Sequence, residues 1–318
     1  MLLLLSSLAF AGYGDAVGGL PSPAERELVL WTNAARVAPE RFKDEYKAGG
    51  CSFDVDFTET ERTAQDPVRW NPDLNEAARF HSVDMADNDW FNHSSSDGTP
   101  MNQRVARYYD HPASENIAWG YPDVYTAVFE GWMCSETGHR GNIMKPDWDE
   151  LGTGIKGVYY TQNFGKAGIE RHPVGVGMHF LSGNLVRFRA EVFDEGGVAP
   201  DRVDVVWNGE HGSMNLEYGV PARGVYLTSR DLAQALETEE PGCYEYYFEA
   251  AWGETTARFP ETGSYGWGDC TFADGDAKWL ARQLEPDEGG GCSSVGAPAG
   301  LVATFAGLLV LARRRRED

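Results

Sequence analysis

Two stretches in the first half of the chain place their apolar residues at helical spacing. In residues 24–37, Leu28, Trp31 and Ala35 share one face, and Ser22 stands where a helix cap is expected. The second stripe recurs at i, i+3, i+4, i+7 and i+11 and comprises Leu74, Ala77, Ala78, His81 and Met85. The pattern predicts two amphipathic helices, with His81 as a hydrogen-bonded core residue.

A third helix is predicted after Pro122. One face, at i+4 steps, comprises Val124, Val128, Trp132 and Glu136. Gly138 is the predicted end of this helix, and His139 follows in the turn. The spacing therefore predicts that Glu136 and His139 point into one cavity. The alternative is a capping Glu136 and a surface His139.

Alternating segments predict strands in the rest of the chain. Residues 151–155 and 158–164 form two predicted strands, which places the helices of the first half around a sheet. Between residues 175 and 284, turn residues separate short alternating segments: 186–192, 203–207 and 244–251. We predict an antiparallel β-sandwich here, with an immunoglobulin-like arrangement as the candidate.

Both ends of the chain have the composition of targeting segments. Residues 1–11 are mostly apolar and close on an A-x-A-type sequence, which predicts a signal peptide; a buried N-terminal segment is the alternative. Residues 12–23 are rich in Gly and Pro and predict a linker. Residues 285–297 are a second predicted linker with a Gly-Cys motif. Residues 298–318 combine an apolar run with four arginines, which predicts a membrane anchor or sorting segment.

The composition fits folded domains and excludes one class of partner. Apolar residues make up 42% of the 318 residues, enough to build cores. The net charge is -22, and the dense basic cluster is confined to residues 313–316. A nucleic-acid partner is therefore not expected, because phosphate binding needs clustered Lys and Arg.

Five cysteines in an exported chain predict disulfides. Cys292 precedes the C-terminal apolar run and is assigned to the sorting signal. The other four allow three pairings, and proximity within each predicted domain favours Cys51–Cys134 and Cys243–Cys270. No C-x-x-C occurs, so a structural zinc knuckle is not expected.

Two imidazoles and two carboxylates make up the candidate chemistry of the first half. His93 lies in a polar loop beyond the second helix, and a loop-borne imidazole on a helical scaffold is a functional candidate. Glu115, Glu136 and His139 complete the set. Such a group can hold a cation, perform acid/base chemistry, or simply rigidify a cleft through hydrogen bonds.

Six segments, in their order and spacing, resemble the motifs of the CAP superfamily, the SCP-like domains of cysteine-rich secretory, antigen 5 and pathogenesis-related-1 proteins. The segments are 30–36, 77–86, 91–94, 114–118, 138–144 and 160–164. The resemblance assigns residues 24–165 to a CAP domain. It implies a three-layer α-β-α sandwich with a large central cleft. The expected fold class is therefore α/β, with the CAP domain followed by the antiparallel β-sandwich.

The family cleft carries two His and two Glu, which hold zinc in some members. His93 and Glu115 match this pattern directly. Glu136 stands one position beyond the family glutamate, where this chain has Ser135. The resemblance implies a zinc site made of His93 and His139 with Glu115 or Glu136.

The second imidazole is assigned by similarity to bacterial members. Eukaryotic members have a His where this chain has Tyr159, whereas bacterial-type members have a Ser-Pro-Gly-His-Arg run. Residues 135–140 resemble that run, with one extra residue and no Pro, so His139 takes the place of the second imidazole.

The tail resembles another known signal. Residues 289–316 are similar to the C-terminal sorting signals of myxobacterial surface proteins. This likeness implies processing near Cys292 and retention at the cell surface, with a simple membrane anchor as the alternative.

Three functions fit these observations. The first is an extracellular or cell-surface module that binds a small-molecule, lipid-like or peptide-like ligand in a His/Glu-lined cleft. The second is a metal-dependent hydrolase, with zinc as the expected cofactor. The third is a surface structural or adhesion protein attached to the membrane through its C-terminal segment.

Overall fold

The computed structural model of this chain describes residues 12–16, 19–182, 185–231 and 243–268. Several predictions lie outside these residues and stay predictions: the signal peptide, the Cys243–Cys270 bridge, the role of Cys292, and segments 285–297 and 298–318. Among the described helices, none has both the length and the apolar character that a membrane span requires.

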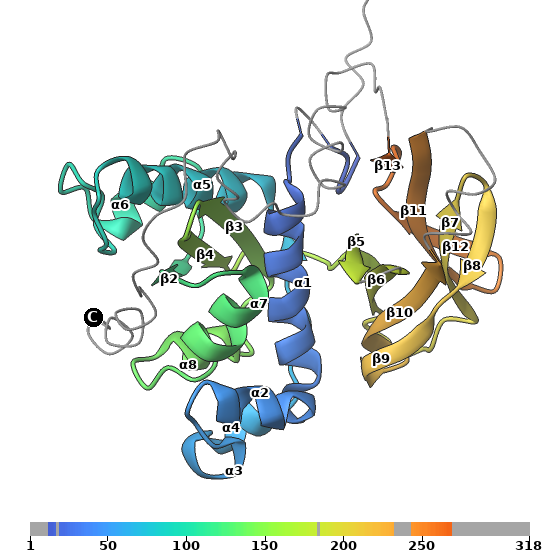
Figure 1. Ribbon diagram of the computed structural model, residues 1–318, viewed down its shortest axis with the longest axis horizontal. Coiled ribbons are helices and arrows are strands. Elements are labelled where there is room, and N and C mark those ends of the chain that lie inside the picture. The colour runs from blue at the N-terminus through green and yellow to red at the C-terminus, as the bar shows by residue number, and fades with distance from the viewer. Residues whose placement is uncertain (1–11, 17–18, 183–184, 232–242, 269–318) are drawn as a thin grey trace, which may run out of the picture.

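The first half forms a four-stranded sheet with helices on both faces (Figure 1). Its strands lie in the order β1 (Arg69–Trp70), β3 (Glu150–Lys156), β4 (Tyr159–Gly165) and β2 (Ala113–Trp119). β1 and β3 run parallel, and the other pairs are antiparallel. The predicted strands 151–155 and 158–164 correspond to β3 and β4, the second shifted by one residue, and β2 lies beside β4 at the edge of the sheet that the described residues form.

Helices cover both faces of this sheet. They are α1 (Pro23–Val37), η1 (Pro39–Phe42), α2 (Lys43–Ala48), α3 (Phe53–Asp56), α4 (Glu59–Arg62), α5 (Pro72–Asp87), α6 (Met101–Val105), α7 (Val124–Thr126), η2 (Ala127–Trp132) and α8 (His139–Ile143). α5 presses onto one face so closely that a Cβ at Gly154 would lie 2.2 Å from the nitrogen of Arg79. α1 packs on the opposite face, where Gln162 of β4 bonds Thr32. Helices on both faces agree with the three-layer arrangement that the resemblance implies.

The helix predicted through Glu136 is wrong in its extent. α7 continues into a π-helical turn, η2, and the helix ends at Trp132. A π-helical turn bonds i to i+5, so the i+4 spacing that placed Glu136 on a buried stripe does not hold there. Glu136 is exposed instead.

The second half consists of two antiparallel sheets packed face to face. One has the order β5 (Val174–Ser182), β6 (Leu185–Phe193), β10 (Arg223–Asp231) and β9 (Asn215–Val220). The other has the order β12 (Thr255–Phe259), β11 (Cys243–Trp252), β7 (Arg202–Trp207) and β8 (Glu210–Ser213), and β13 (Tyr265–Gly268) also pairs with β11.

Aromatic side chains fill the space between these two sheets. The ring centroid of Phe188 in β6 lies 5.2 Å from that of Tyr246 in β11, and Gly177 in β5 leaves room for Phe248. The predicted segments 186–192, 203–207 and 244–251 lie within β6, β7 and β11. The buried aromatic residues of β11 therefore form core, as their alternation predicts.

Helix α1 joins the two halves into one hydrophobic core (Figure 1). The face of α1 that does not meet the first sheet packs on the outer side of β5, β6, β10 and β9. Trp31 is central: its ring lies 5.8 Å from Phe180 and 6.2 Å from Tyr218, centroid to centroid, and 5.0 Å from the guanidinium of Arg189.

A buried carboxyl group lies in this junction. Asn33 of α1 donates from its amide nitrogen to Glu191 of β6, and Glu191 is only 2% exposed. Burial raises the pKa of Glu191 to about 8, because the apolar surroundings disfavour the charged form more than the Asn33 hydrogen bond and the charges of Arg171 and Arg36 favour it. Glu191 is therefore largely a neutral acid near pH 7.

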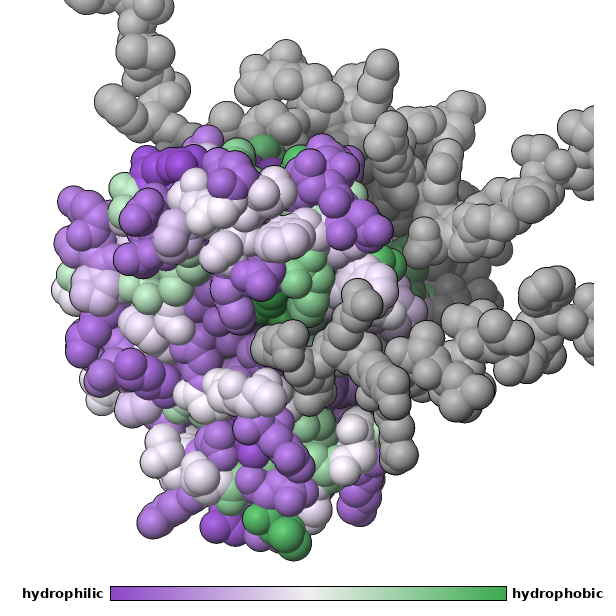
Figure 2. Space-filling model, turned by 90° about the vertical axis from the view of Figure 1, so that its left-hand side faces the viewer, coloured by the Kyte–Doolittle hydropathy of each residue, from purple (hydrophilic) through white to green (hydrophobic). Residues whose placement is uncertain are grey.

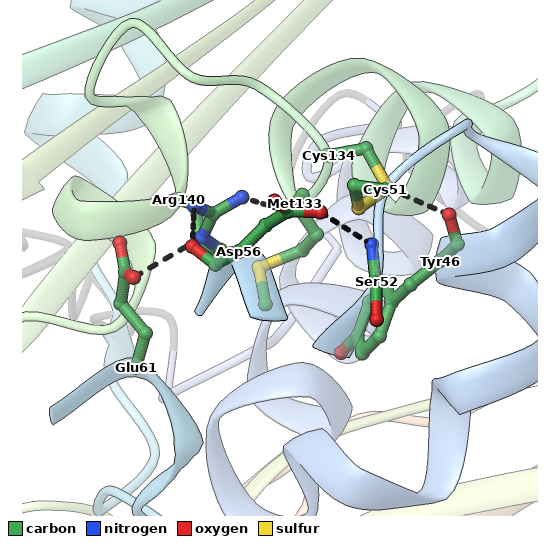
Figure 3. Close-up of a disulfide and its surroundings, with 8 residues drawn as sticks. All are labelled: Tyr46, Cys51, Ser52, Asp56, Glu61, Met133, Cys134 and Arg140. Atoms are coloured by element: carbon green, nitrogen blue, oxygen red, sulfur yellow. Dashed lines mark hydrogen bonds and ion pairs between the residues drawn. A yellow bond between two sulfur atoms is a disulfide. The ribbon is translucent and has the colours of Figure 1, made fainter. Parts of the chain in front are cut away.

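A disulfide and an arginine fasten the segment that follows η2 (Figure 3). Cys51 and Cys134 are bonded, which confirms the predicted pair. Arg140 donates to the carbonyl oxygens of Met133 (3.1 Å) and Asp56 (2.7 Å). These contacts tie the segment from Cys134 to Arg140 to the segment from Cys51 to Asp56.

We expect the Cys51–Cys134 bridge to stabilise the fold strongly. Its closure spans a sequence separation of 83 residues, for which the chain-entropy description gives about 4.5 kcal/mol. Urea unfolding at pH 7 of a Cys51→Ser/Cys134→Ser variant should show a loss of that order. A variant as stable as wild type would contradict this.

Glu191 should make stability depend on pH. Its pKa in the folded state, about 8, lies above the usual 4.5, so the folded chain holds a proton that the unfolded chain has released. The resulting stability is fully present below about pH 4.5 and is lost as pH rises through 8. We expect Glu191→Gln to gain stability relative to wild type between pH 5 and 8.5 in urea titrations. An unchanged difference across that range would contradict the assignment.

Candidate functional site

A polar cleft opens beside the edge strand β2, between the loop after α5 and the N-terminal part of α8. Its volume is about 380 Å³. The lining residues are His93, Ser114, Glu115, Asn116, Thr137, Gly138, His139, Gly141, Asn142 and Lys145. Among the described residues, no purely hydrocarbon side chain belongs to this lining.

One side of the cleft is a hydrogen-bonded trio around Glu115. The Nδ1 of His93 lies 2.9 Å from Oε1 of Glu115, and Nη2 of Arg104 pairs with Oε2. Arg104 also donates to the carbonyl oxygen of His93 (2.8 Å). The side chains of Glu115 and Arg104 are buried, whereas that of His93 is 43% exposed. The buried pair therefore holds His93 in place, with its other ring nitrogen directed away from Glu115.

The opposite side of the cleft carries His139. Its Nδ1 lies 3.0 Å from Oγ of Ser135, and Ser135 is itself within hydrogen-bonding distance of Thr137 (2.8 Å between the hydroxyl oxygens). Burial, with a smaller contribution from His93, lowers the pKa of His139 to about 4. At neutral pH this imidazole is uncharged and can both donate and accept a hydrogen bond.

A chain of hydrogen-bonded side-chain amides holds the segment that carries His139. Asn116 donates to the carbonyl oxygen of His139 (3.2 Å) and to Gln162 (3.1 Å), and Asn142 donates to Asn116 (3.0 Å). Gln162 in turn donates to Thr32 of α1 (2.6 Å). The position of His139 is thus connected by side-chain hydrogen bonds to the central helix.

The structure brings together three of the four predicted site residues. His93, Glu115 and His139 line the same cleft, whereas Glu136 is exposed and lies outside its lining. Ser135, which stands at the family glutamate position, is the residue that contacts His139. Because Glu136 stands one position beyond the family glutamate, the group that contacts His139 is the hydroxyl of Ser135 and not a carboxylate.

The donor set does not fit a zinc centre. Zinc sites supply at least three protein ligands, but among the described residues no three His, Cys, Asp or Glu side chains are grouped for one metal ion. Glu136 lies outside the cleft, and both oxygens of Glu115 are engaged by His93 and Arg104. The predicted metal set of His93 and His139 with Glu115 or Glu136 is therefore not assembled.

Two further residues near the site have structural roles. His81 is fully buried, and its Nε2 bonds the carbonyl oxygen of Asn92 (3.0 Å), in keeping with a core histidine. Arg104 is absent from the sequence-based prediction, although it neutralises Glu115. It stands 11 residues from both His93 and Glu115, and no local pattern marks that spacing.

The first half matches a known family. Residues 31–167 match the model of CAP, the cysteine-rich secretory protein family. Together with the layered fold and the cleft, this match identifies the segment as a CAP (SCP) domain.

Two Bacillus subtilis (strain 168) proteins resemble parts of this chain. The uncharacterized membrane protein YlbC is 41% identical over 99 residues, which is 30% of this chain and 28% of YlbC. The uncharacterized protein YkwD is 35% identical over 116 residues, which is 35% of this chain and 44% of YkwD. The chain therefore matches less than half of the length of either relative.

Solved structures with partial likeness come from other bacteria. An extracellular protein containing an SCP domain from Bacillus anthracis is 35% identical, and the likeness covers 32% of this chain and 34% of that protein, with a TM-score of 0.30. An outer surface protein from Borrelia burgdorferi is 22% identical, and the likeness covers 31% of this chain and 77% of that protein, with a TM-score of 0.28.

Removing Arg104 should expose the cost of the buried carboxylate. Arg104→Met leaves the buried carboxyl group of Glu115 without its positively charged partner, so we expect a loss of about 3–5 kcal/mol in the free energy of unfolding. Adding Glu115→Gln to the same chain should restore much of the lost free energy of unfolding, because the buried carboxyl group is then replaced by an uncharged amide. Urea unfolding at pH 7 measures both. Equal losses in the single and double variants would contradict the role of the ion pair.

Proposed function

We propose that the CAP domain is a binding module for a polar, peptide-like ligand, which the cleft beside β2 receives. The character of the lining carries this proposal. Hydroxyl, amide and imidazole groups surround a space of about 380 Å³, and such groups serve to orient a ligand through hydrogen bonds.

The same lining disfavours the lipid-like alternative. A hydrocarbon chain gains affinity by burying apolar surface, and the described residues that line this cleft are polar residues and glycines, with no purely hydrocarbon side chain among them. The molecular face on the side of α6 and α8 is also predominantly hydrophilic, with only small hydrophobic areas among its coloured residues (Figure 2).

The charge balance suits a neutral peptide main chain. Arg104 neutralises Glu115, and His139 is uncharged at neutral pH. Lys145, exposed at the margin with its Nζ 4.4 Å from the ring centroid of Trp148, adds one positive charge. Peptide carbonyl groups, which need donors and no counter-charge, match this cleft better than a cation does.

The metal-dependent hydrolase receives less support. It requires a third metal ligand beside the two imidazoles, and the carboxylate that could supply one is paired with Arg104. Binding without metal chemistry is therefore the function that we favour.

We place the protein outside the cytoplasm, anchored or sorted through residues 298–318. The Cys51–Cys134 bridge supports this, since disulfides persist in oxidising compartments. The apolar segment of residues 1–11 supports export as well.

We further propose that the second half is an immunoglobulin-like module that packs against the CAP domain and supports it. The strands β5 to β12 can be labelled in chain order as A, B, C, C′, D, E, F and G. With these labels, the strand order of one sheet is ABED and that of the other is GFCC′. The ABED sheet and the CFG core of the other are the sheets of constant-type immunoglobulin domains.

His139 should contribute directly to peptide binding. We would screen a fluorescent library of N-acetylated pentapeptide amides against the full chain by anisotropy, and then compare variants on the tightest peptide. We expect His139→Ala to weaken binding about tenfold, the worth of one hydrogen bond in a cleft. Glu136→Ala is the matched control: it removes an exposed side chain three residues away and should change affinity less than about twofold. Failure of every peptide to bind, or equal losses in both variants, would contradict the proposal.

A further inference from the structure

Strand β2 is an edge strand, and the cleft lies along its free side. Among the described residues, β2 is the last strand of the sheet order, and its strand partner is β4. An edge strand carries main-chain N–H and C=O groups that no neighbouring strand satisfies. Ser114, Glu115 and Asn116 of β2 all line the cleft.

Hydrogen bonds at both ends of β2 show which residues turn their main chain outward. Lys166 donates to the carbonyl oxygen of Pro112, and Gly120 donates to that of Val158, both at 3.0 Å. In an antiparallel pair these bonds involve every second residue, so even-numbered residues face β4 and odd-numbered residues face away. The carbonyl oxygen of Ile117 agrees, since it accepts from the indole nitrogen of Trp132 (2.9 Å) instead.

Glu115 is the outward-facing residue that opens into the cleft. Its side chain is 1% exposed, whereas the residue as a whole is 7% exposed, so the accessible atoms belong mainly to its main chain. The next outward carbonyl, that of Ile117, is occupied by Trp132. Within the cleft, the accessible part of the edge is therefore short and centred on Glu115.

The two imidazoles flank this position from opposite faces of the sheet. Side chains of neighbouring strand residues point to opposite faces. On one face Glu115 binds His93, and on the other Asn116 binds the carbonyl oxygen of His139. A chain lying along the edge at Glu115 would pass between His93 and His139.

We propose that the cleft takes a peptide segment in extended conformation, which pairs with β2 at Glu115 as a short additional strand. This rests on the proposed peptide-binding function and specifies its mode. One residue of the peptide exchanges two hydrogen bonds with Glu115: its N–H donates to the carbonyl oxygen, and its C=O accepts from the N–H.

A peptide main chain matches this edge in a way that other polar ligands do not. It carries a donor and an acceptor on the same residue, in the spacing that an antiparallel neighbour requires. Because the main chain supplies the pairing, specificity would come from the side chains on either side, which face His93 and His139.

The test uses the tightest pentapeptide from the library screen, on the full chain. Each amide of the peptide is replaced singly by an ester, which removes the N–H without adding bulk. We expect one ester position to weaken binding about tenfold and the adjacent positions to change it less than about twofold. Equal tolerance of the ester at every position would overturn the strand pairing.

A second readout comes from the protein. Amides of Ser114, Asn116 and Ala118 are already bonded to β4, so pairing should slow hydrogen exchange mainly at Glu115 within residues 113–119. Peptide binding that slows no amide of this strand would also overturn the inference. Absence of any peptide binding would instead refute the proposed function itself, so the two failures are distinguishable.

Discussion

Burial of helix α1 on both sides is the constraint on which the rest of this structure depends. One side packs on the CAP sheet and the other on the sheet β5-β6-β10-β9, with Trp31 between Phe180 and Tyr218. A helix enclosed in this way cannot leave its polar groups to water, so they need partners in the protein. Asn33 meets Glu191 there, and directed hydrogen bonds as well as apolar contact orient the two halves.

The same helix reaches the cleft. Arg36 donates to the carbonyl oxygen of Lys145 (2.9 Å), at the end of the segment that carries His139. Thr32 accepts from Gln162, which connects through Asn116 to the carbonyl oxygen of His139. The sheet β5-β6-β10-β9 therefore contributes indirectly to the site, because it covers the outer side of the helix that holds one wall of the cleft.

Electrostatics decide what kind of cleft this is. The charge of Glu115 is balanced inside the protein by Arg104, and burial keeps His139 neutral. A buried ion pair is weak evidence for stability, because desolvation offsets the attraction, but it does orient its neighbours. Here the neighbour is His93, and the result is a cleft suited to hydrogen bonding at an open strand edge.

Local patterns in the sequence determined much of this molecule: the helices around Trp31 and Ala77, the alternating strands of both halves, and the Cys51–Cys134 bridge all follow from spacing, proximity and residue type. The motifs around His93, Glu115 and His139 also marked residues that the fold gathers in one cleft. Tertiary structure alone decided that Arg104 neutralises Glu115, that α1 serves both halves, and that Ser135 rather than Glu136 contacts His139. The physical reason is that periodicity describes one element at a time. A π-helical turn changes the phase of side chains after Trp132, and contacts between distant segments depend on how the elements pack, which no local spacing records.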